Sequence, residues 1–378
     1  MSVELRNSFR VDDYAMRYSV FMPRLYNFCL SLGMEPDKMM PSRAFCSDEN
    51  QGYPIIMIAK HFGTFPFNHG RVGGIVATDR HGPHAHHGED LVIIQASHVG
   101  YEPETGEFGI YRRLQTEEHE CSTDCGAICN VIDWYKREYD FACAQIKLDF
   151  IDGEHLVVID NQLVSDEREE GLLLNFERLI DMERGLEAPV GQLSTARVYR
   201  ASGEYVKRVG KMWPTYRKAI GRNLFPDLFT FHRDMGSNID ASRRINRNLI
   251  KSMPTILCSK FPPLSAAQVN VQVEFDRTFR SIVNEPAYRG KWVVFISGIH
   301  IDVSPSEGQI FPHTKYVPWA AYVQNDAGEG YTLEQDELFR VLANQSSENP
   351  NKIDLTEVIG NMKRDAEIKI RADADRYG

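Results

Sequence analysis

The chain has 378 residues, 42% hydrophobic and 25% charged, an ordinary globular composition that excludes wholesale disorder and fibrous repeats. With 43 basic against 53 acidic residues the formal net charge is −10, which argues against a surface built to bind nucleic acid. No run approaches the roughly 18 consecutive apolar residues of a membrane helix, and Met1 to Arg10 lacks the layout of a secretory signal. We therefore expect a cytoplasmic protein without membrane partners.

In chain order, the first predicted element is an amphipathic helix over Asp12–Leu32, with Gly33 after it. Ile55–Ile58 and Leu91–Ala96 are short apolar runs of strand type, and Ile128–Tyr139 has helical spacing. Alternating helices and buried strands predict an α/β fold, in which functional sites collect at the carboxyl ends of the strands.

Residues 166–219 are charged and helix-prone, most of all Glu167–Arg184, with Gly185 as a plausible stop. We predict a helical connector there, since the segment lacks the composition of a flexible linker. Residues 366–378 are predicted to form a charged, solvated tail.

One sequence run recurs in the second half of the chain. Leu91–His98 resembles Val293–His300, and each copy has Pro and Gly five and eight residues after its histidine. Upstream, Pro41–Asp48 is echoed by Pro254–Lys260. The recurrence predicts tandem duplicated domains at about 1–165 and 220–365. The second copy is expected to be degenerate, because Lys260 replaces Asp48 and residues 314–345 contain no cysteine.

The chain has seven cysteines, an odd number in a large protein, which leaves thiols available as ligands or nucleophiles. Cys46 and Cys125, together with His98 at the end of a buried strand, form a ligand set that suits zinc. Three protein ligands leave a fourth position for water or a carboxylate. In such an open site the pKa of bound water falls to about 7.

Other assignments of these residue types remain open. Cys121 and Cys129 compete with Cys125, because the three thiols have helical spacing. The histidine-rich run 80–90 could be a solvated loop or an independent metal centre that uses His81, His84, His86 and Asp90. Gly70–Gly74 lacks the Lys and Ser/Thr of a phosphate-binding loop, so we expect it to allow close backbone packing.

Several short motifs, in their order along the chain, resemble the limiting-carbon-dioxide-inducible protein B/C family. They are Cys46-Ser47-Asp48-Glu49, Gly73-Gly74, Ser97-His98-Val99-Gly100 with Gly106 and Gly109, Arg112-Arg113, and Cys125-Gly126-Ala127. The resemblance covers roughly residues 12–160, and the C-terminal half of the chain resembles the same family more weakly. That family comprises theta-class carbonic anhydrases, so the resemblance implies a β-carbonic-anhydrase-like fold for this chain. With the recurrence described above, we expect this fold twice, as a tandem pseudo-dimer.

The resemblance also implies the roles of individual residues. Cys46, His98 and Cys125 would ligate Zn²⁺, with the Asp48 carboxylate at the fourth position, paired with an arginine. The β-class pattern places that arginine two residues after the aspartate, where this chain has Asn50. The partner must then come from elsewhere, and the candidates are Arg43, Arg71, Arg112 and Arg113.

The implied activity is reversible hydration of carbon dioxide to bicarbonate by a zinc-bound hydroxide, with one working site per chain. A histidine suits the proton-transfer step, and His87 is the first choice. The alternative is a carbonic-anhydrase-like protein that binds bicarbonate or a protein partner without turnover. The number of associated chains stays open, with a homo-oligomer as one possibility.

Overall fold

The structure, a computed structural model, describes residues 10–77, 90–112, 121–165, 169–234, 241–306 and 313–348, together with 309, 351, 353, 354, 356, 357 and 360. The expected charged tail, 366–378, lies outside these residues. In the part of the chain that is described, no helix has the length and hydropathy needed to cross a membrane.

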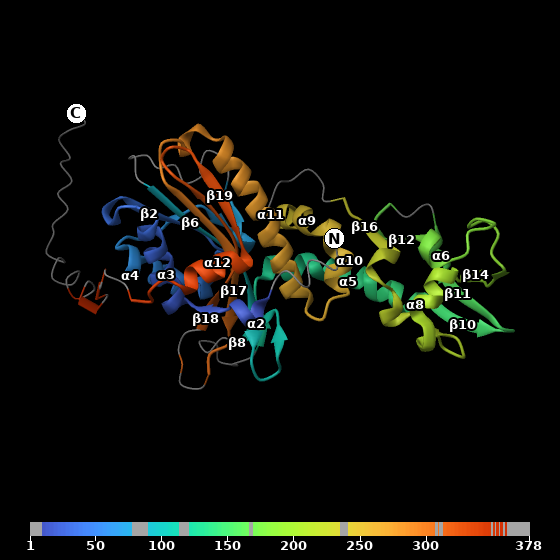
Figure 1. The fold of residues 1–378 in the computed structure, drawn as a ribbon. Helices are drawn as coiled ribbons and strands as arrows, with labels where there is room; N and C mark the ends of the chain where they lie inside the picture. Colours follow the sequence, from blue (N-terminus) through green and yellow to red (C-terminus); the bar gives the residue numbers. More distant parts are fainter. Residues whose placement is uncertain are drawn as a thin grey trace, which may run out of the picture.

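An eight-stranded sheet lies at the centre of the larger of two lobes (Figure 1). Its strand order is β1-β18-β17-β6-β2-β3, with β19 paired to β18 and β7 to β6. The four strands β3, β2, β6 and β17 run parallel, and the other pairings are antiparallel. The strands are β1 (Met16–Arg17), β2 (Met39–Ala44), β3 (Phe67–Asn68), β6 (Asp90–Glu102), β7 (Glu107–Phe108), β17 (Val293–Val303), β18 (His313–Gln324) and β19 (Gly330–Glu334).

Helices cover both faces of this sheet, so the central strands are apolar on both sides. On one face, Ile94 and Ile296 pack in a cluster with residues of α3 (Tyr18–Ser31), α4 (Gly52–Phe62) and α12 (Gln335–Ala343). On the other face, Ile93 and Phe295 pack against Phe275 of the long helix α11 (Pro262–Asn284). A short helix, α2 (Val11–Tyr14), precedes β1.

Helix α5 (Gly126–Gln145) runs from the sheet toward a second lobe, residues 146–232 (Figure 1). This lobe contains a five-stranded antiparallel sheet of order β13-β14-β11-β10-β15 and a separate antiparallel pair of strands, β12 and β16. A buried apolar cluster extends without a break from Cys46 through α5 to Leu179 of the second lobe. The remaining elements are β4 (Gly70–Arg71), β5 (Ile75–Val76), β8 (Ile110–Arg112), β9 (Cys121–Thr123), β10 (Lys147–Ile151), β11 (Glu154–Asp160), α6 (Asn161–Val164), β12 (Gly171–Leu174), α7 (Phe176–Leu179), β13 (Gly191–Gln192), β14 (Ala196–Arg200), α8 (Gly203–Val209), β15 (Lys218–Ala219), β16 (Phe229–His232), α9 (Ala241–Leu249) and α10 (Met253–Leu257).

Most of the predicted N-terminal elements are confirmed. The first predicted helix is observed as α3, but it begins at Tyr18 and not at Asp12, because Met16–Arg17 pair as strand β1. Gly33 follows α3 with φ +99°, a conformation that favours glycine. Leu91–Ala96 lies within β6 and Ile128–Tyr139 within α5. The strand predicted at Ile55–Ile58 is wrong, because this run lies inside helix α4. A run of four apolar residues fits either structure, and only the longer pattern that buries Met57, Ile58 and Phe62 identifies the helix.

The predicted helical connector at 166–219 is also wrong. Gly171–Leu174 pairs as strand β12 with Phe229–His232, and helix α7 has only four residues. Strands β13, β14 and β15 follow in the same segment. Tertiary pairing overrides the helix propensity of the charged residues here.

The structure has one sheet where a tandem of two was expected. Strand β17, from the supposed second copy, lies directly beside β6 in parallel, and Val293 pairs with Leu91 and His300 with His98. The upstream echo has no structural counterpart, because Pro41 lies in strand β2 and Pro254 in helix α10. The similar runs are therefore neighbouring central strands of a single β-sheet, and both halves of the chain build it.

Candidate metal centre

Four side chains predicted from the sequence meet at the carboxyl ends of β2 and β6. Cys46 and Asp48 follow the end of β2, His98 lies near the end of β6, and Cys125 immediately precedes α5. One ligand atom from each of these residues can be chosen so that all four lie within 4.8 Å of one another. Ligands of a tetrahedral zinc ion at about 2.0–2.3 Å lie roughly 3.3–3.8 Å apart, so this cluster has a suitable size.

Solvent reaches the cluster from one side only. Cys46, His98 and Cys125 are at most 2% exposed. The Asp48 side chain is 32% exposed, and its Oδ2 lies 3.0 Å from His98 Nε2. The two thiols belong to the same buried cluster as Ile75 and Ile128, which provides an apolar wall. The two thiols are therefore buried against apolar groups, and the Asp48 carboxylate is the most exposed group of the site.

The backbone at Cys125 adopts an unusual conformation that places its thiol. Cys125 has φ +48° and ψ +66°, which is the left-handed region and is uncommon for a residue with a Cβ. Its carbonyl accepts from the N–H of Ile128 and Cys129 in the first turn of α5. Helix α5 begins at the next residue, so the start of the helix fixes the position of this thiol.

The Gly73-Gly74 motif brings a backbone amide to the other thiol. The Gly73 N–H donates to Cys46 Sγ at 3.1 Å. Gly73 and Gly74 both have positive φ, and a Cβ at Gly74 would lie 2.1 Å from the carbonyl oxygen of Ala96. Only glycine fits this close approach, in agreement with the predicted packing role of the segment.

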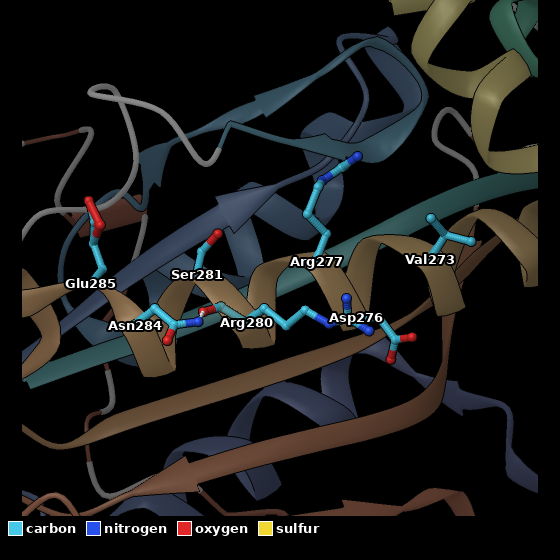
Figure 2. A pocket seen from close by; sticks show the side chains of 7 residues that line it. All are labelled: Val273, Asp276, Arg277, Arg280, Ser281, Asn284 and Glu285. Carbon is cyan, nitrogen blue, oxygen red and sulfur yellow. Dashed lines mark hydrogen bonds between the residues drawn. The ribbon is translucent and has the colours of Figure 1, made fainter.

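Helix α11 supports the same glycine segment from behind. Asn270 donates to the carbonyl of Gly73 at 3.0 Å, and Glu274 accepts from the N–H of Val76 at 3.0 Å. Glu274 also pairs with Arg277, whose side chain extends into a surface pocket of about 620 Å³ along α11 (Figure 2). A buried polar layer thus connects the thiol-binding loop to α11.

The two thiols and the imidazole of the cluster shift the pKa values of one another. A hydrogen bond from the Cys125 thiol and the nearby His98 hold the pKa of Cys46 well below its usual range, against the effect of burial. That same hydrogen bond, together with burial, raises the pKa of Cys125. Burial lowers the pKa of His98, but the negative charges of Cys125 and Asp124 outweigh it and raise the pKa overall.

The donor set therefore fits zinc. The buried Nε2 of His98 has no hydrogen-bond partner among the described atoms and lies beside the Asp48 carboxylate. A divalent cation held by Cys46, His98, Cys125 and Asp48 would replace the shared protons and neutralise the buried negative charge. Two sulfurs, one imidazole and one carboxylate match the preferences of Zn²⁺.

A comparison with known protein families finds a match over the N-terminal part of the chain. The family described as limiting CO2-inducible proteins B/C, beta carbonic anhydrases, matches residues 15–182, which include all four residues of the cluster. Over these residues, which make up less than half of the chain, the sequence is similar to that family. No curated protein matches the chain.

Solved structures related to this family have a similar fold. The crystal structure of PtLCIB4, a homolog of the limiting CO2-inducible protein LCIB, has a TM-score of 0.51 and 10% identity, over 89% of this chain and 99% of that one. A point mutant of PtLCIB4 gives a TM-score of 0.50 and 10% identity, over 87% and 95%. The crystal structure of LCIB gives 0.44 and 14%, over 85% and 95%.

The structure describes arginines that were predicted to pair with Asp48, among them Arg43 and Arg112. Arg112 pairs with Glu102 and Glu104, at 3.2 and 2.9 Å. Arg43 lies in β2 and is half-buried, and burial lowers its pKa. Asn50, at the position of the β-class arginine, donates to Asp124 Oδ1 at 2.6 Å. The identity of the arginine partner stays a prediction.

The structure does not describe all of the other candidates. His87, His81, His84, His86 and Arg113 lie outside the described residues, as does the side chain of Cys121. Asp90 begins β6, at the opposite end from His98, and accepts from the N–H of Trp292. Cys129 lies one turn into α5, and its thiol donates to the carbonyl of Asp124. Of Cys125 and Cys129, whose side chains the structure describes, Cys125 is the one that joins the four-residue group.

The sequence analysis missed the residues on the far side of His98. His98 Nδ1 lies 3.0 Å from Asp302 Oδ2 and 3.3 Å from Asp124 Oδ2. Gln51 donates to Asp302 at 2.9 Å, and its carbonyl oxygen contacts His300 Nδ1. Asp302 comes from β17, far from the motifs in sequence. The available signal was the alignment of His98 with His300, which places Asp302 two residues further along the neighbouring strand.

Proposed function

We propose that this protein is a zinc-dependent carbonic anhydrase, which interconverts carbon dioxide and bicarbonate at the cluster of Cys46, Asp48, His98 and Cys125. The observation that carries the proposal is the convergence of these four side chains within 4.8 Å. The family assignment over residues 15–182 supports the same reaction.

Each residue has a proposed part in holding or shaping the site. Cys46, His98 and Cys125 would bind the metal from the buried side, where apolar neighbours exclude water. Zinc bound there would supply Lewis acidity, which makes water a nucleophile at neutral pH. Asp48, at the exposed side, would bind or release the fourth position and orient the reactants.

The proton produced in hydration must leave through the open side of the cluster. Asp48 lies at this opening, and its carboxylate can accept or pass a hydrogen bond there. His87 remains the proposed carrier to solvent, as inferred from the sequence.

The proposal is tested by metal analysis and by stopped-flow carbon dioxide hydration on the full chain. We expect one zinc per chain in the wild type, and loss of both zinc and activity in Cys46→Ala. Cys143→Ala is the matched control, because Cys143 lies in α5 away from the cluster and its thiol donates to the carbonyl of Gly221. It should retain zinc and activity.

Asp48→Asn separates catalysis from metal binding. It should retain zinc on the three buried ligands but lose most of its hydration activity. A zinc-replete wild type without hydration activity would contradict the proposal and favour a protein that binds bicarbonate or a partner without turnover.

A further inference from the structure

The ring nitrogen of His98 that faces away from the thiols lies between two buried carboxylates. Asp302 Oδ2 is 3.0 Å from Nδ1 and Asp124 Oδ2 is 3.3 Å from it, and all three side chains are at most 1% exposed. A neutral imidazole has a single N–H. Only one of the two carboxylates can therefore receive it as a strong hydrogen bond.

The contacts of the two carboxylates identify Asp302 as the acceptor. Asp302 Oδ2 is hydrogen-bonded to His98 Nδ1 and also accepts from Gln51 Nε2 at 2.9 Å. Its other oxygen accepts from the Thr314 hydroxyl at 2.9 Å. By contrast, the Asp124 oxygen that faces His98 has no hydrogen-bond partner among the described atoms.

We propose that Asp302 is the positioning residue of the metal centre. By accepting the Nδ1–H, it selects the tautomer in which the lone pair of His98 Nε2 points at Cys46 and Cys125. It also fixes the ring in that orientation. The inference rests on the proposed zinc site, where a carboxylate behind a histidine ligand orients the ring and raises its basicity.

The sheet explains how a residue 204 positions away reaches His98. His98 pairs with His300 in the parallel register of β6 and β17, and Asp302 pairs with Gly100. Asp302 is thus the diagonal neighbour of His98 on the same face of the sheet. The C-terminal half of the chain therefore contributes directly to the metal centre through β17.

A set of variants separates hydrogen bonding by Asp302 from simple burial. Asp302→Ala removes the acceptor. In Asp302→Asn the amide oxygen can still accept from His98 and Gln51, while the amide NH₂ turns to the Thr314 hydroxyl, which can accept. Asp149→Ala is the matched control, since Asp149 is a buried carboxylate of the second lobe, paired with Arg217.

The experiment measures zinc affinity of the full chain by chelator competition and the absorption spectrum of the cobalt-substituted protein. We expect Asp302→Ala to bind zinc about 10–100-fold more weakly and to change the cobalt spectrum. Asp302→Asn should stay within a few-fold of wild type with a wild-type spectrum. Asp149→Ala should not change either readout.

Nitrogen NMR of the zinc-loaded wild type gives a test that does not depend on the folding of a variant. His98 should have a protonated Nδ1 and a metal-bound Nε2. The opposite tautomer, or an Asp302→Ala protein with unchanged affinity and spectrum, overturns the role of Asp302 alone. A wild type that binds no zinc overturns both the proposed centre and this inference.

Discussion

His98 and His300 lie opposite each other on neighbouring strands, in sequence runs that look alike, but the residues around them differ completely. His98 faces two thiols and three carboxylates, from Asp48, Asp124 and Asp302. His300 lies among aromatic rings, with ring centroids 4.6 Å from Phe45 and 5.2 Å from Tyr18. Its ring nitrogens contact the Gln51 carbonyl oxygen and the Tyr18 hydroxyl.

The two environments move the histidine pKa in opposite directions. Burial lowers the pKa of both rings, but at His98 the surrounding anions outweigh burial and raise it. At His300 burial and the charge of His98 both lower the pKa, well below its usual range. The same strand motif thus places one histidine among candidate metal ligands on β6 and a neutral, buried histidine on β17. The neighbours decide the role, and the motif alone does not.

The largest expected effect comes from replacing the histidine on β6. In His98→Gln the amide can still donate to Asp302, so the fold should persist, but it is a poor zinc ligand. We expect zinc to be lost and the rate of hydration to fall at least about 100-fold. This exceeds the loss that is typical when a residue hydrogen-bonded to a metal ligand is replaced. Metal analysis and stopped-flow hydration measure this. A variant that keeps one tightly bound zinc would remove His98 from the ligand set.

The same substitution on β17 should leave the metal in place and weaken the fold. His300→Gln removes a ring packed against Phe45 and Tyr18 and disturbs the hydrogen bonds to Gln51 and Tyr18. We expect the free energy of unfolding to fall by about 2 kcal/mol, with zinc content unchanged. Denaturant titration and metal analysis on both glutamine variants make the comparison direct. Zinc loss in His300→Gln would show that this histidine also serves the metal.

This comparison also shows what the sequence could predict. The proposed ligands Cys46, His98 and Cys125 were predicted from short motifs, and the structure brings their side chains together. The recurrence of Leu91–His98 at Val293–His300 was a real signal with a different meaning. Both runs are central parallel strands buried on both faces, and such strands share an apolar pattern without duplication.

The residues behind His98 could not be found in this way. Asp302 and Gln51 act through pairing between β6 and β17, and the intervening chain includes the whole second lobe. That pairing depends on the order of the strands in the sheet, which the spacing of nearby residues does not predict. The same reason explains the error at 166–219, where Gly171–Leu174 forms a strand only because Phe229–His232 lies beside it.

The smallest expected effect is a difference in how stability depends on pH. Because the pKa of His300 is lowered in the folded protein, the unfolded chain binds a proton more readily. The stabilisation from neutral His300 is complete above the unfolded pKa of about 6.5 and declines as the pH falls below it. In His300→Gln there is no side chain at this position that takes up a proton when the chain unfolds. The stability advantage of the wild type should therefore shrink by about 1 kcal/mol between pH 7 and 5.5. Denaturant titrations of both proteins, with a chelator present so that zinc release does not contribute, measure this difference, because the other titrating groups cancel. If the stability difference between the two proteins stayed constant over this range, His300 would be protonated in the folded protein. The pKa values of His98 and His300 would then differ less than their surroundings predict.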